Sequence, residues 1–136
     1  MFNTVLFPID ESREAREAVG VVCELVSKYQ SRLVLLSVVE ETAEGEDASS
    51  GKMVDEAAVA KLLEGAKALF AQKGITAEVI ERKGMPAFTI CDVADEVEAN
   101  LIIMGSRGIG LTEEGAAESV TNRVINLAPC PVLVVP

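Results

Sequence analysis

Runs of apolar residues alternate with amphipathic stretches along the whole chain. Five runs predict strands, at residues 4–9, 32–39, 76–81, 101–104 and 132–135. Four of these runs are almost entirely apolar, which is typical of strands covered by helices on both faces of a sheet. The run at 76–81 is more polar, and this indicates a position near the edge of the sheet.

Four segments between these runs carry apolar residues at the three- and four-residue spacing of an amphipathic helix. The predicted helices begin at Ser12 and at Pro86, and two more span Met53–Lys73 and Ser119–Leu127. We expect Ser12 to cap the first helix and Gly74 to end the second, with Pro86 at the first position of the third. A regular alternation of strands and helices predicts a parallel sheet with right-handed crossovers.

Size and composition describe a globular protein. The 136 residues fit one domain with a hydrophobic core, so we expect a single domain over residues 1–136. Hydrophobic residues make up 49% of the chain and charged residues 25%, which excludes intrinsic disorder. No apolar run approaches the roughly 18 residues that span a bilayer, and the first residues lack the basic segment of a signal peptide. We therefore expect a cytoplasmic protein.

The charge balance restricts the possible partners. A formal net charge of −10 argues against nucleic acid and anionic membranes, because both bind basic surfaces. An acidic block between Glu40 and Gly51 contributes to this charge, and it predicts a solvated loop.

Several kinds of catalysis are excluded. The chain has no histidine, which rules out Ser-His-Asp and Cys-His mechanisms and leaves zinc without a plausible set of ligands. The three cysteines, Cys23, Cys91 and Cys130, lie far apart in apolar sequence, so we expect reduced thiols in or near the core. We identify no general base or nucleophile. The protein is not expected to be an enzyme beyond a slow ATPase activity.

The strongest chemical signal is Gly105-Ser106-Arg107-Gly108, which directly follows the buried run 101–104. Glycines let a backbone approach a phosphate closely, and the Arg107 guanidinium can donate charge-assisted hydrogen bonds. The motif therefore lies at the carboxyl end of a predicted strand. In open α/β sheets, ligands with phosphate groups bind at the edge that the carboxyl ends of the strands form. The alternative is a flexible loop with a solvated arginine. A P-loop is excluded because the chain contains no Gly-Lys-Ser/Thr, and Gly110 does not complete a dinucleotide-binding fingerprint.

The chain resembles the universal stress protein family over its whole length. The most specific matches are Gly105-Ser106-Arg107-Gly108 and the closing run Ala-Pro-Cys-Pro-Val-Leu-Val-Val, with Gly84-Met85-Pro86 at the expected place. The resemblance implies an α/β fold with a Rossmann-like open five-stranded parallel sheet of order 3-2-1-4-5 and helices on both faces. Strands one and four would then be neighbours whose connections leave in opposite directions, which creates a crevice at their carboxyl ends. Proteins of this family are typically small cytoplasmic homodimers.

One branch of the family binds ATP, and the resemblance implies an adenine nucleotide at these strand ends. Asp10 would lie near the ribose or a phosphate-bound cation, although a turn or capping role fits its position equally well. Val38 and Val39 would contact the adenine edge through their backbone, and Ser119 and Thr121 would bind terminal phosphates at the start of a helix. Both hydroxyls are equally typical of helix starts without a ligand, and we expect Ser119 to cap this helix whether or not a ligand binds. The implied nucleotide-binding residues are Pro8, Ile9, Asp10, Val38, Val39, Gly84, Met85, Pro86, Met104, Gly105, Arg107, Gly108, Ser119, Val120 and Thr121.

Glu118 departs from the pattern of the ATP-binding branch, which has a glycine at this position. One contact between like charges near 4 Å is unfavourable by about 1 kcal/mol in water and about 4 kcal/mol at a partly shielded site. Glu118 is therefore expected to weaken ATP binding, unless its side chain turns to solvent or joins Asp10 in holding Mg²⁺. AMP or cyclic AMP carries less charge and is affected less.

Two functions remain open from the sequence. The first is a stress protein that binds ATP, AMP or cyclic AMP, with Mg²⁺ if the ligand is ATP. The second is an interaction module without a ligand, which acts through its acidic surface and its dimer face. In the implied strand order, Val132, Leu133, Val134 and Val135 form an edge strand that is too apolar to stay open. We expect two copies of this strand to pair in a homodimer.

Overall fold

The computed structural model describes residues 2–9, 13–40, 48–105 and 116–135. Within them, strands and helices alternate in the predicted order. The elements are β1 (Thr4–Pro8), α1 (Arg13–Tyr29), β2 (Arg32–Glu40), α2 (Ala48–Gln72), β3 (Ala77–Gly84), α3 (Pro86–Glu96), β4 (Leu101–Gly105), α4 (Ala116–Leu127) and β5 (Val132–Val135). The strands form one parallel sheet in the order β3-β2-β1-β4-β5, which confirms the fold that the resemblance implied.

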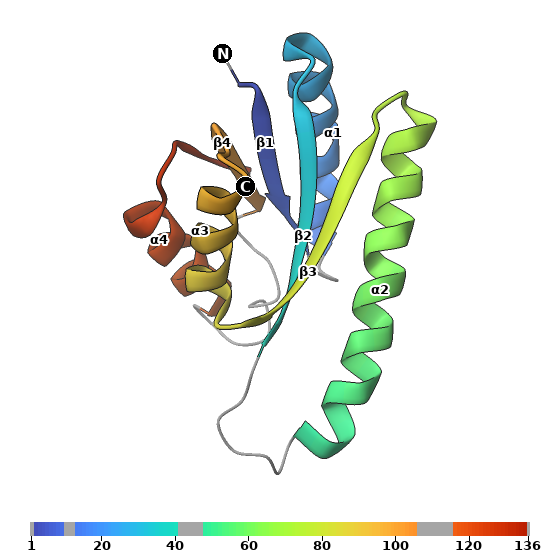
Figure 1. The fold of residues 1–136 in the computed structure, drawn as a ribbon, viewed down its shortest axis with the longest axis vertical. Coiled ribbons are helices and arrows are strands. Elements are labelled where there is room, and N and C mark those ends of the chain that lie inside the picture. The colour runs from blue at the N-terminus through green and yellow to red at the C-terminus, as the bar shows by residue number, and fades with distance from the viewer. Residues whose placement is uncertain (1, 10–12, 41–47, 106–115, 136) are drawn as a thin grey trace.

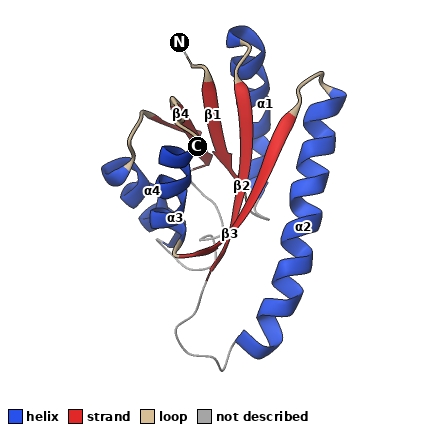
Figure 2. Ribbon diagram, viewed as in Figure 1, coloured by secondary structure: helices blue, strands red, loops and turns tan. Residues whose placement is uncertain are grey.

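The sheet lies between two layers of helices. Helices α1 and α2 cover one face, and α3 and α4 cover the other (Figures 1 and 2). Alternate residues of the central strands point to opposite faces, so both faces must be apolar. Val5 and Phe7 of β1 accordingly pack under α1 and α2, whereas Leu6 packs under α3 and α4.

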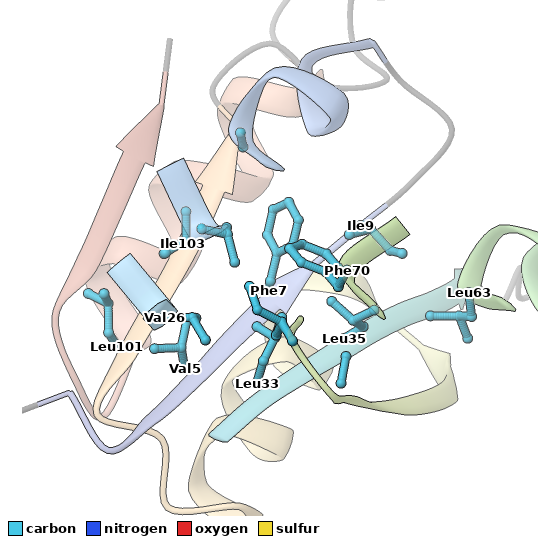
Figure 3. Packing of buried hydrophobic residues seen from close by; sticks show 14 residues of the cluster. Val5, Phe7, Ile9, Val26, Leu33, Leu35, Leu63, Phe70, Leu101 and Ile103 are labelled. Carbon is cyan, nitrogen blue, oxygen red and sulfur yellow. The ribbon is translucent and has the colours of Figure 1, made fainter. Parts of the chain in front are cut away.

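The larger of the two cores centres on a pair of aromatic rings. Phe7 of β1 and Phe70 of α2 meet edge to face, with ring centroids 6.3 Å apart and an interplanar angle of 90°. Both side chains are almost completely buried, and Leu35 and Ile103 lie beside them in the same cluster (Figure 3). This contact fixes α2 against the strand whose carboxyl end belongs to the predicted site.

Gly74 ends α2 as predicted. It adopts a φ of +81°, and the amide of Ile75 donates to the Phe70 carbonyl at 2.9 Å while the amide of Gly74 donates to the Ala71 carbonyl at 3.0 Å. These two bonds form a Schellman motif. The same left-handed position is occupied by Gln30 after α1 and by Glu98 after α3, with φ values of 52° and 56°.

Several element boundaries differ from the predictions. Helix α2 begins at Ala48 rather than Met53, and β2 includes Glu40, so the acidic block is not a loop throughout. Strand β3 continues to Gly84 instead of ending near residue 81, because β2 pairs with it up to that residue. Pro86 is the first residue of α3, as predicted, and Ser12 lies outside the described residues.

Helix α4 begins at Ala116, so the prediction that Ser119 caps this helix is wrong. Ala116, Ala117 and Glu118 are all compatible with a helix, and the chain enters the helix before the serine. Ser119 therefore lies inside the first turns of α4 rather than at its end.

Candidate functional site

The carboxyl ends of β1 and β4 lie side by side in the sheet. Val5 pairs with Leu101 and Leu6 with Ile102, so β1 has β4 as its neighbour on one side and β2 on the other. The chain leaves β1 for α1 on one face and leaves β4 for α4 on the other (Figure 1). This is the strand reversal at which open α/β sheets bind ligands.

Strands β2 and β3 extend beyond the end of β1. Pro8 pairs with Leu36, and the amide of Ile9 donates to the Leu36 carbonyl at 2.8 Å, whereas β2 continues to Glu40. Figure 1 shows these two strands running on past the tip of β1 toward the turn before α3. Val38 and Val39 lie on this extension, Val39 being buried and Val38 half-buried.

The turn between β3 and α3 contains the second group of implied residues. Gly84 has a φ of +150°, and a Cβ atom at this position would lie 2.6 Å from the Thr89 hydroxyl, so the turn requires glycine. Met85 is the N-cap residue of α3 without a side-chain hydrogen bond, and its own side chain is 55% exposed. These features also suit a plain connection between a strand and a helix.

Phe88 is a residue at this edge that the sequence pattern did not single out. Its side chain is 50% exposed and lies in the first turn of α3, three residues after the exposed Met85. A phenylalanine outside the apolar spacing of a helix is the signal that could have indicated it. Together, Met85 and Phe88 give this end of the molecule an apolar surface.

The end of β4 is held by packing and by one side-chain hydrogen bond. Met104 is 7% exposed and belongs to the same core cluster as Val120 and Val38. Gly105 pairs with Val135 of β5. Its carbonyl oxygen accepts a hydrogen bond from the Thr121 hydroxyl at 3.4 Å, and Thr121 is itself buried.

Part of the implied site falls outside the described residues. Asp10, Arg107 and Gly108 lie there, as do the side chains of Glu118 and Ser119, although both of these residues belong to the first turns of α4. The described residues contain no group of three histidine, cysteine, aspartate or glutamate side chains that could hold a metal ion. The side chains of Asp10 and Glu118, the Mg²⁺ ligands that the sequence suggested, lie outside this described set.

An ion pair between β3 and α3 joins Arg82 to Glu96, with 2.7 Å between Nη2 and Oε1. Both side chains are about half exposed, so the pair contributes little to stability.

Burial is the main cause that raises the pKa of the thiols of Cys23, Cys91 and Cys130. These cysteines are therefore protonated at neutral pH and are poor nucleophiles.

A hollow at the opposite end of the sheet does not fit a phosphate ligand. It has a volume of about 440 Å³ and lies between the carboxyl ends of α1 and α2. Its lining includes Ser27, Gln30, Ser31 and Thr76, but no charged side chain.

No helix among the described residues is both long and apolar enough to cross a membrane.

Comparison with known proteins gives a consistent result. The model of the universal stress protein family matches residues 1–136. Universal stress protein Sll1654 of Synechocystis is 63% identical over 136 residues, a match that covers 100% of this chain and 87% of the relative. The solved structure of universal stress protein UspA from Lactobacillus plantarum superposes with a TM-score of 0.83 and 27% identity, and the match covers 99% of this chain and 98% of that one.

Two more distant solved structures contain nucleotides. A universal stress protein in complex with cyclic AMP has a TM-score of 0.77 and 21% identity, over 99% of this chain and 97% of that one. The Arabidopsis thaliana family protein At3g01520, with AMP bound, has a TM-score of 0.74 and 23% identity, over 98% of this chain and 90% of that one. At these identities the similarity shows a shared fold.

Proposed function

This chain belongs to the universal stress protein family, and we propose that it is a cytoplasmic stress-response protein that binds an adenine nucleotide at the carboxyl ends of β1 and β4. The observation that carries the proposal is the adjacency of these two strands. It puts Gly105, the first glycine of Gly105-Ser106-Arg107-Gly108, next to the tip of β1. Backbone amides and a guanidinium at this position suit an anionic ligand.

The two ends of the proposed ligand would meet different surroundings. The phosphate would lie toward Gly105, Arg107, Gly108 and the first turns of α4. The base would lie toward Val38, Val39 and the turn Gly84–Pro86, where the exposed side chain of Met85 offers an apolar surface. Asp10 comes shortly after β1 in the sequence and is proposed to contact the ribose or a cation.

AMP and cyclic AMP are the ligands that this site favours. Glu118 replaces the glycine of the ATP-binding branch and adds negative charge where terminal phosphates would lie. A monophosphate presents fewer charges to this carboxylate than a triphosphate. The family proteins with AMP and with cyclic AMP bound support this choice. If ATP binds, Asp10 and Glu118 are the proposed ligands of its Mg²⁺.

A ligand-free interaction module is the second candidate. The carboxylate of Glu118 and the net charge of −10 favour it, because both oppose a polyanionic ligand. Neither candidate requires catalysis, and we propose no enzymatic step.

We expect the free protein to bind AMP or cyclic AMP in an isothermal titration, and an Arg107→Ala variant to bind at least about tenfold more weakly. The reason is the loss of a charge-assisted hydrogen bond, which contributes about 1.5–3 kcal/mol. Arg123→Ala is the matched control, because Arg123 is exposed on α4 and lies beyond its first turns. If the wild-type protein binds none of ATP, AMP and cyclic AMP at millimolar concentration, the nucleotide proposal is wrong and the interaction module is favoured.

The same proposal includes a homodimer that forms through β5. This strand is an edge of the sheet, and all four of its residues are only partly buried. The amide of Ile102 donates to the Pro131 carbonyl at 3.0 Å, and backbone groups alternate along a strand, so the amide of Val134 points away from β4.

A Val134→Pro variant is therefore expected to keep its fold and to dissociate into monomers at micromolar concentration. Proline removes an outward amide and is tolerated on an edge strand. Val134→Thr keeps both the amide and the branched shape, and it should remain a dimer. Sedimentation velocity distinguishes the species, and a monomeric wild-type protein would contradict the proposal.

A further inference from the structure

A side-chain hydrogen bond joins the end of β4 to the second turn of α4. The Thr121 hydroxyl donates to the carbonyl oxygen of Gly105 at 3.4 Å, across a sequence separation of 16 residues. A threonine inside a helix ordinarily donates to a carbonyl of the preceding turn. Thr121 is 6% exposed, so its hydroxyl needs a protein partner, and the partner in this structure is a strand.

The acceptor of this hydrogen bond, the Gly105 carbonyl, belongs to the proposed nucleotide site. Gly105 is the last residue of β4 and the first glycine of Gly105-Ser106-Arg107-Gly108. The packing of Val120 and Val124 in the same cluster as Met104 holds α4 over the sheet, but apolar contacts are not directional. A hydrogen bond is directional, and this bond, although long at 3.4 Å, therefore restrains the orientation of the Gly105 carbonyl relative to α4.

We propose that Thr121 is a positioning residue of the nucleotide site, whose buried hydroxyl holds the Gly105 carbonyl and thereby orients the end of β4 relative to α4. The inference rests on the proposed function. It assigns Thr121 a role other than the phosphate contact that the resemblance implied, because the hydroxyl hydrogen is already directed at Gly105. A site whose ends are fixed before binding loses less conformational entropy when the ligand arrives.

The test uses Thr121→Val, which removes the hydroxyl and keeps the branched shape, and Thr121→Ser, which keeps the hydroxyl. The ¹³C resonance of the Gly105 carbonyl in the ligand-free protein reports the hydrogen bond directly. We expect this resonance to move in the valine variant and to stay near its wild-type position in the serine variant. The affinity for AMP should fall about fivefold in the valine variant, the effect of losing one hydrogen bond, and should stay within about twofold in the serine variant.

Each other outcome overturns the inference in a recognisable way. A shifted Gly105 resonance with unchanged AMP affinity means that the bond is purely structural. A loss of affinity without a shift means that the hydroxyl contacts the ligand itself. If the wild-type protein does not bind AMP, the proposed function is wrong and the inference is wrong with it. If the wild type binds and the valine variant binds equally well, only the inference is wrong.

Discussion

A Glu118→Gly variant is expected to bind ATP more tightly than the wild-type protein, by a factor between about 5 and about 1,000. The lower limit corresponds to one like-charge contact in water, about 1 kcal/mol, and the upper limit to one at a partly shielded site, about 4 kcal/mol. Glu118 belongs to the first turn of α4, the end of the helix at which an anionic group of the ligand would be stabilised. Isothermal titration with ATP and Mg²⁺ measures the change.

The design of this experiment separates charge from space. Glu118→Gln removes the charge and keeps a side chain of similar size. An equal gain in ATP affinity in both variants assigns the effect to charge. A gain in the glycine variant alone assigns it to the space that the side chain fills. AMP affinity should change less than ATP affinity, because fewer phosphate charges are involved. Weaker ATP binding in the glycine variant would contradict this account, and it would instead indicate that Glu118 helps to hold Mg²⁺.

Glycine inside a helix also lowers its stability. The replacement removes a favourable carboxylate from the first turn and introduces a residue with a helix propensity about 1 kcal/mol below that of alanine. Denaturant titration of each ligand-free variant is the necessary control, since a partly unfolded protein would appear to bind weakly. The glutamine variant keeps most of the helix propensity and is the better comparison for affinity.

The strand arrangement could be predicted from the sequence because it depends on local patterns and on general rules of topology. Apolar runs such as Leu101–Met104 mark buried strands, and the intervening amphipathic segments are long enough for crossover helices. The strand order itself came from the resemblance. The local patterns and the resemblance together predicted that β1 and β4 are neighbours, and the proposed site depends on this.

The features that the sequence did not reveal depend on contacts between distant residues. The length of β3 is set by pairing with β2, so its polar end at Arg82 and Lys83 did not look like a strand. The hydroxyl of Thr121 resembled a helix-start residue, whereas its acceptor lies on another element. Gln30 and Glu98 end their helices in a left-handed conformation that usually favours glycine, and nothing in their local sequence indicated it.

A Phe70→Ala variant is expected to lose about 3–5 kcal/mol of unfolding free energy, the largest stability effect that we anticipate for a single substitution. Phe70 is fully buried, and its ring meets Phe7 edge to face in the centre of the core (Figure 3). Removing the ring leaves a cavity between α2 and β1 that the rigid sheet cannot close. Urea unfolding measures the loss, at one fixed protein concentration because a dimer adds to apparent stability.

Leu69→Ala is the matched control, because Leu69 is the preceding residue of the same helix and is 38% exposed. We expect it to lower the unfolding free energy by less than about 1 kcal/mol. Comparable losses in both variants would contradict the assignment of Phe70 as the main anchor of α2. The consequence for function follows from the position of Phe7, which directly precedes Pro8 at the tip of β1. A folded Phe70→Ala protein should therefore also bind AMP more weakly, since the strand that carries one side of the proposed site has lost its packing partner.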